Sequence, residues 1–118
     1  MSDGDDMDDL VAALRLQFIA ALPDHADTIR RAWRSLDGGA EPAVRRAAVA
    51  ELLHRAHRLV GGGAMVGLPA ISEAAAPVEE MLRAVLEGGE ALMLPAALAP
   101  FVARLLASCD AASVTARG

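Results

Sequence analysis

Glycine and proline divide this chain into segments in which apolar residues recur every three or four positions. The first segment shows the pattern in Leu10, Val11, Leu14, Phe18, Ala21 and Leu22. This spacing is typical of the buried face of an α-helix. Aromatic residues make up only 3% of the chain, and Ala and Leu are abundant whereas β-branched residues are few, which argues against a sheet. We therefore predict an all-α fold.

The breakers predict where the helices begin and end. We expect a break at Pro23, a kink at Pro77, and helices over residues 8–22, 23–37, 42–63, 69–88 and 92–113. Short glycine-containing connections make successive helices antiparallel. The predicted architecture is an antiparallel up-down four-helix bundle with an additional N-terminal helix. It occupies residues 8–114, between an acidic flexible tail at 1–7 and a C-terminal tail at 115–118.

The charges are unevenly distributed. Five of the 16 acidic residues lie in the first nine positions, which leaves 11 arginines and 11 acids from Leu10 onward. The arginines are scattered and no aromatic residues alternate with them, so we expect no nucleic-acid partner. With 118 residues the chain is long enough for one domain with its own core, and we expect a monomer.

Cysteine and hydropathy bear on the compartment. The single cysteine, Cys109, cannot form an internal disulfide. The acidic N-terminus lacks the apolar stretch of a signal peptide. The longest uncharged apolar stretch, Ala91–Ala103, has 13 residues, fewer than the ~20 that span a bilayer. We expect a cytoplasmic protein without a membrane partner.

One histidine stands out on the predicted helix over 42–63. At about 100° per residue, Leu52 and Leu59 fall on the core face and His57 points almost the opposite way. The residues around His57 are small or aliphatic, with His54 at the border: Ala50, Leu53, Val60, Gly61 and Ala64. Three successive glycines each cost a helix about 1 kcal/mol relative to Ala. Tight packing or close approach of another backbone must compensate.

The residues Ala56-His57-Arg58-Leu59-Val60-Gly61-Gly62-Gly63, followed by Gly67-Leu68, resemble the signature of histidine phosphotransfer (HPt) domains of bacterial phosphorelays. The family pattern is roughly Ala-His-x-Leu-Lys-Gly, with a second glycine ten residues after the histidine. The resemblance implies that His57 accepts a phosphoryl group from the phosphoaspartate of a receiver domain or from a sensor histidine kinase. It then passes the group to a response-regulator receiver. The implied protein is a phosphocarrier and not an enzyme.

The residues around His57 suggest how the group is held. If the hairpin turn centres near Gly67, His57 lies beside residues 76–80, where Glu79 or Glu80 can accept the proton of the imidazole nitrogen that is not phosphorylated. Val60 stands where the family has a lysine, and Arg58 or Arg83 can supply the missing positive charge. Gly61 and His54 border the site. We expect docking on Leu53, Val60 and Ala64, with no cofactor or metal here, because the receiver brings Mg²⁺.

Other interpretations remain at this point. Because Val60 replaces the lysine, a degenerate HPt-like bundle can bind a receiver or kinase without phosphotransfer. His54 and His57 are three residues apart and could share a metal or haem, although only arginines and a glutamate lie near them. An ordinary enzyme is least supported, since the chain has no glycine loop between strand and helix and no Ser/His/Asp arrangement.

Overall fold

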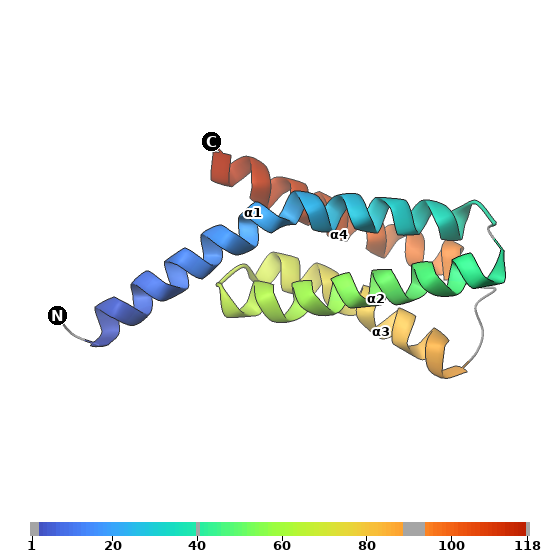
Figure 1. Cartoon of the computed structure of the whole chain (residues 1–118), viewed down its shortest axis with the longest axis horizontal. Helices are drawn as coiled ribbons and strands as arrows, with labels where there is room; N and C mark the ends of the chain where they lie inside the picture. The colour runs from blue at the N-terminus through green and yellow to red at the C-terminus, as the bar shows by residue number, and fades with distance from the viewer. Residues whose placement is uncertain (1–2, 40, 89–93, 118) are drawn as a thin grey trace.

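The computed structural model describes residues 3–39, 41–88 and 94–117, and in these ranges it contains helices and no strand. The helices are α1 (Asp3–Asp37), α2 (Pro42–Met65), α3 (Pro69–Gly88) and α4 (Leu94–Arg117). Consecutive helices run antiparallel (Figure 1). α1 packs on α2 and α4, and α3 packs on the same two helices. The prediction of an all-α, up-down bundle is confirmed.

The predicted break at Pro23 is wrong, and with it the separate N-terminal helix. α1 is one helix of 35 residues with Pro23 inside it. A proline within a helix removes one backbone hydrogen bond and costs about 3 kcal/mol. Leu22 on one side of it and Ala26 and Ile29 on the other are buried in the same core. Packing of one continuous face therefore offsets the local penalty.

Other helix ends also differ from their predicted positions. α1 begins at Asp3, within the stretch that we expected to be a tail, and α4 runs to Arg117, beyond the expected boundary at 114. Gly61–Gly63 lie inside α2, which ends after them; Gly67 then turns the chain with a φ of 76°. Pro77 and Pro100 lie within helices without ending them. The predicted start at residue 92 lies outside the described residues.

The core is aliphatic and is contributed by all four helices. Leu52 and Leu59, which the helical wheel predicted to face the core, are at most 1% exposed, and Ile71, Val78 and Leu82 of α3 are at most 2% exposed. The largest fully buried side chains of the other two helices are Leu22, Ile29, Leu36, Leu98, Val102 and Leu105. Cys109 is buried among them, and burial raises the pKa of its thiol to about 11. This thiol is a packing group at neutral pH.

Helix α4 is the most apolar of the four. Its segment Ala96–Thr115 has a mean hydropathy of 1.4 and is long and apolar enough to cross a membrane, by length and composition only. In the bundle, one face of the helix is in the core. From its exposed side, Asp110 accepts two hydrogen bonds from Arg30 of α1, at 3.0 and 3.2 Å. This ion pair and the buried face tie α4 to α1.

The first turns of α1 extend past the end of α2 (Figure 1). We call residues 3–13 the projecting segment. Every residue from Asp6 to Ala13 is exposed, and the molecule measures 56 × 29 × 21 Å as a result of this extension. Contact with the bundle begins at Leu14, which is half-buried.

Candidate functional site

His57 lies on the outer face of α2. Its side chain is 69% exposed, whereas Ala56 and Leu59, on the other side of the helix, are 0% exposed. The helical wheel predicted this orientation. An imidazole placed in this way is accessible to a large partner and has no role in the core.

A carboxylate from α3 holds the imidazole. Oε2 of Glu79 lies 2.5 Å from Nδ1 of His57, in the register expected for a hairpin turning near Gly67. Arg83, one turn further along α3, donates to the same oxygen at 2.8 Å. Because a carboxylate can only accept, the shared hydrogen sits on Nδ1. In the neutral ring this leaves the lone pair on Nε2.

The three glycines after His57 have different neighbours. A Cβ on Gly62 would lie 2.5 Å from the Phe18 ring of α1. A Cβ on Gly63 would lie 3.1 Å from both the Leu68 carbonyl oxygen and the Ser72 backbone nitrogen. A Cβ on Gly61 would meet nothing within 4 Å. The tight packing expected to compensate for the glycines is therefore at Gly62 and Gly63, and Gly61 leaves open space beside His57.

Gly61 and Gly63 should respond oppositely to the same substitution. Gly61→Ala is expected to raise the free energy of unfolding by about 1 kcal/mol, because it gains helix propensity without a clash. Gly63→Ala is expected to lower it, because backbone of α3 must move away. Urea unfolding of both variants measures the difference. If Gly63→Ala stabilises as much as Gly61→Ala, the close approach of α2 and α3 is not a constraint.

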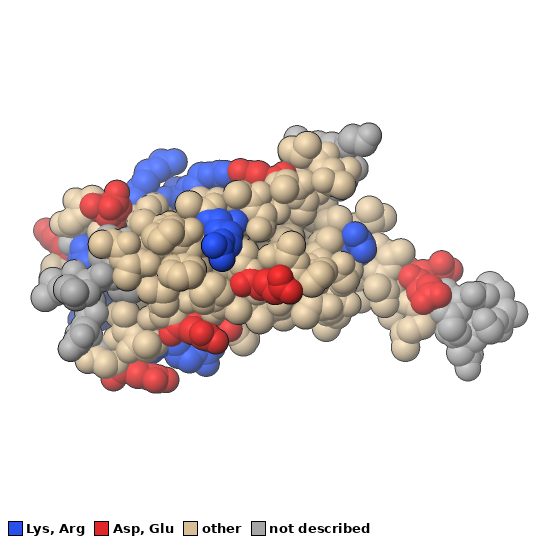
Figure 2. Space-filling view, turned by 180° about the vertical axis from the view of Figure 1, so that it is seen from behind, with Lys and Arg blue, Asp and Glu red and all other residues tan. Residues whose placement is uncertain are grey.

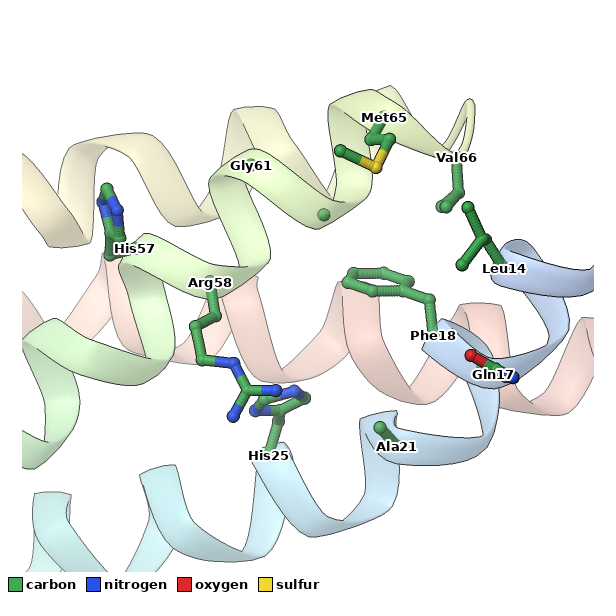
Figure 3. A pocket seen from close by; sticks show the side chains of 11 residues that line it. Leu14, Gln17, Phe18, Ala21, His25, His57, Arg58, Gly61, Met65 and Val66 are labelled. Atoms are coloured by element: carbon green, nitrogen blue, oxygen red, sulfur yellow. The ribbon is translucent and has the colours of Figure 1, made fainter. Parts of the chain in front are cut away.

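A groove runs beside His57 between α1 and α2 (Figure 3), with a volume of about 510 Å³. His57 is at one end, and Leu14 and Val66 are at the other. Its wall is largely apolar and consists of Leu14, Gln17, Phe18, Ala21, His25, His57, Arg58, Gly61, Gly62, Met65 and Val66. Sequence reasoning missed the α1 side of this groove. The sequence contains Phe18, one of only two phenylalanines, and the glycine cluster Gly61–Gly63, but it has no local signal that pairs the two.

The expected cations do not contact the imidazole. Arg58 points across the groove toward His25 of α1 and away from His57 (Figure 3). Arg83 contacts Glu79 and is 54% exposed. Val60 is half-buried, and its carbonyl accepts a hydrogen bond of 2.8 Å from Ser72 of α3. Arg83 thus has another partner, and Arg58 points toward another histidine.

In the described ranges, the other predicted site residues make no hydrogen bond with His57, whose partner is Glu79. His54, Ala64 and Glu80 are exposed, and Leu53 is half-buried. At about 100° per residue, Leu53, Val60 and Ala64, the expected docking surface, fall on the other side of His57 from Arg58 and Gly61, which line the groove. Of the two candidate carboxylates, the structure places Glu79 and not Glu80 at the imidazole.

His25 is a buried histidine in the groove wall. It is 3% exposed, and its Nδ1 lies 3.1 Å from a guanidinium nitrogen of Arg55, which makes Nδ1 an acceptor. Arg55 also binds Asp24 at 2.9 Å, and this hydrogen bond and charge lower the pKa of Asp24. Burial, and then the positive charges of Arg55 and Arg58, lower the pKa of His25. His25 is therefore neutral at neutral pH.

This shift predicts a pH dependence of stability. The pKa of His25 in the fold lies below its ordinary value of 6.5, so below that pH the unfolded chain binds more protons and the fold loses stability as pH falls. In His25→Gln, the decrease in Tm from about pH 7 to about pH 5 should be smaller than in the parent. His54→Gln, at an exposed position, is the control. Equal slopes in the parent and in His25→Gln would contradict the assignment.

The sequence left open that His54 and His57 share a metal, and the described ranges contain no set of side chains that could hold one. No three His, Cys, Asp or Glu side chains of residues 3–39, 41–88 and 94–117 gather closely enough to hold a metal ion. The imidazole of His57 contacts the Glu79 carboxylate, which in turn contacts Arg83. This arrangement orients the ring.

Comparison with known protein families identifies the family to which the chain belongs. A model of the Hpt domain matches residues 13–113. Comparisons with curated proteins and with solved structures gave no significant match. The matched range covers most of the chain and includes His57, Glu79 and both walls of the groove. The four-helix architecture, the exposed histidine and this match agree, and the chain belongs to the Hpt domain family.

Proposed function

We propose that this chain is a phosphorelay intermediate of the cytoplasm, in which Nε2 of His57 carries the phosphoryl group. The donor is the phosphoaspartate of a receiver domain or a sensor histidine kinase, and the acceptor is the receiver of a response regulator. Membership of the Hpt family implies phosphotransfer in two-component signalling by a carrier module. The observation that supports His57 most is its exposed ring, held through Nδ1 by Glu79.

The transfer needs no proton movement in this chain. The lone pair of Nε2 attacks phosphorus, the N–P bond forms, and the P–O bond to the aspartate breaks, so that the aspartate leaves as a carboxylate. The ring then carries a positive charge that is shared with the Nδ1–H group. Glu79 accepts that hydrogen bond and stabilises the charge. The second transfer reverses these steps on another receiver, which supplies its own aspartate and Mg²⁺.

Glu79 is a positioning residue in this scheme. Glu79→Gln retains an acceptor for Nδ1–H but removes the negative charge, so we expect the equilibrium between phosphohistidine and phosphoaspartate to move up to about tenfold toward the receiver. Glu80→Gln, at the exposed neighbouring position, is the matched control. Nitrogen NMR of His57 should show the Nδ1–H form in the parent and a mixture of tautomers in Glu79→Ala. An unchanged tautomer and equilibrium would show that Glu79 only packs.

A second function is docking to a receiver or kinase without phosphotransfer. One observation favours it: Val60 offers no charge, and neither Arg58 nor Arg83 contacts the imidazole. The two functions differ in one measurable product, a phosphoryl group on His57.

Direct labelling decides between them. The chain is incubated with phosphoramidate, a small phosphoryl donor, and separately with each phosphorylated receiver domain of its source organism. We expect acid-labile label from both kinds of donor, on Nε2 of His57 by phosphorus and nitrogen NMR. Binding of a receiver without label from either donor would support docking alone and overturn the carrier function.

A further inference from the structure

The projecting segment carries an apolar stripe that continues the α1 wall of the groove. Met7, Leu10 and Val11 are 62%, 54% and 38% exposed. At about 100° per residue they fall within about 100° of one another on the helix. Leu14, Phe18, Ala21 and His25, which line the groove, lie in the same sector. One apolar face thus runs along α1 from Met7 to the groove beside His57.

The described chain covers only the groove half of this face. Arg15 lies near the turn after α2, where its guanidinium would be 3.7 Å from a Cβ on Gly67. Met65, at the end of α2, is 70% exposed and borders the junction. Beyond this point Met7, Leu10 and Val11 are exposed, as is every other residue from Asp6 to Ala13. The stripe is therefore accessible to a partner protein bound in the groove beside His57.

The charge around the stripe limits what the partner can be. Acidic residues cluster on the projecting end (Figure 2), and the sequence places five of the 16 acids in the first nine positions, before the first arginine. Two copies of this negatively charged segment would repel each other. An anionic lipid surface would repel the segment in the same way. An apolar patch with a basic rim is the complementary surface.

The distance along α1 from the stripe to the groove is shorter than the diameter of a receiver domain docked over His57. Val11 is 14 residues before His25, or about 21 Å along the helix. A globular domain of ~120 residues is on the order of 35 Å across. A domain of this size placed on the groove therefore reaches the stripe and gains apolar contact area beyond the groove itself.

We propose that the projecting segment is a second docking surface, on which Met7, Leu10 and Val11 contact a basic-rimmed apolar patch of the receiver domain that occupies the groove beside His57. This inference rests on the proposed function. The segment acts on the affinity for the receiver and leaves the chemistry at Nε2 unchanged.

The test compares two faces of the same helix. The triple variant Met7→Ser, Leu10→Ser, Val11→Ser removes the stripe, and Leu16→Ser changes a side chain that is 68% exposed on the opposite face. The probe is the receiver domain that exchanges phosphoryl groups fastest with the parent. We expect the triple variant to raise KM for this receiver at least about tenfold, with kcat and labelling by phosphoramidate within about twofold of the parent. Leu16→Ser should match the parent in all three.

The charged rim is tested separately. Asp6→Asn, Asp8→Asn and Asp9→Asn in one chain should raise KM for the same receiver at low salt and weaken the salt dependence of KM. Circular dichroism of each variant verifies that α1 remains helical, since serine and asparagine lower helix propensity.

The outcomes separate this inference from the proposed function. An unchanged KM in the helical triple variant overturns the second docking surface and leaves the carrier function intact. Absence of label on the parent from phosphoramidate and receivers alike overturns the carrier function, and the inference with it. If the triple variant instead loses a dimer seen for the parent in light scattering, or loses binding to vesicles of anionic lipid, the stripe has a different occupant and the inference is wrong.

Discussion

His57→Gln is expected to abolish phosphoryl transfer while leaving the fold intact. Glutamine has a comparable length, but its amide nitrogen has no lone pair available for attack on phosphorus. The side chain of His57 is 69% exposed, so its replacement removes no core contact. We expect acid-labile label from a phosphorylated receiver to fall below detection, with helix content and Tm within error of the parent.

The control for this variant is on the same helix. His54 is exposed and one turn before His57, and no hydrogen bond orients its ring toward the site among the described contacts. His54→Gln should transfer phosphate at nearly the parent's rate. Label retained by His57→Gln, or lost by His54→Gln, would assign the phosphoacceptor to a different histidine.

Leu59→Ala is expected to lower the free energy of unfolding by about 2–5 kcal/mol. Leu59 is 0% exposed and belongs to the central cluster of the bundle. Its removal leaves a cavity between packed helices, and the neighbouring aliphatic side chains refill such a space only in part. For a domain of this size the loss is a large share of the total stability.

Leu86→Ala is the matched control, because Leu86 is 47% exposed and its truncation leaves no enclosed cavity. Its cost should stay below about 1 kcal/mol. Urea unfolding monitored by circular dichroism measures both variants. Equal costs for Leu59→Ala and Leu86→Ala would mean that α2 does not present the face described here to the core.

Much of the site could be predicted from the sequence because its determinants are local. The orientation of His57 away from Leu59 follows from the helical period alone. That His57 lies beside residues 76–80 of α3 follows from two antiparallel helices joined at Gly67, where a φ of 76° suits glycine. Neither inference requires knowledge of a distant segment.

The other features of the site depend on packing between segments that are far apart in the sequence. The sequence does not choose between Glu79 and Glu80 or state that Arg58 turns toward His25, since helix rotation and side-chain rotamers depend on neighbouring helices. The α1 wall of the groove was missed because Phe18 and Gly62 are 44 positions apart and meet only in the bundle.

Pro23 shows most clearly which features the sequence determined and which the tertiary structure decided. By itself the sequence determined an all-α bundle, the core face of α2 and the exposure of His57, because these depend on periodicity and on turn residues. Local rules also predicted a helix end at Pro23. Only the tertiary structure decided that α1 continues, because Leu22, Ala26 and Ile29 are buried on both sides of the proline and their combined burial outweighs a local cost of about 3 kcal/mol.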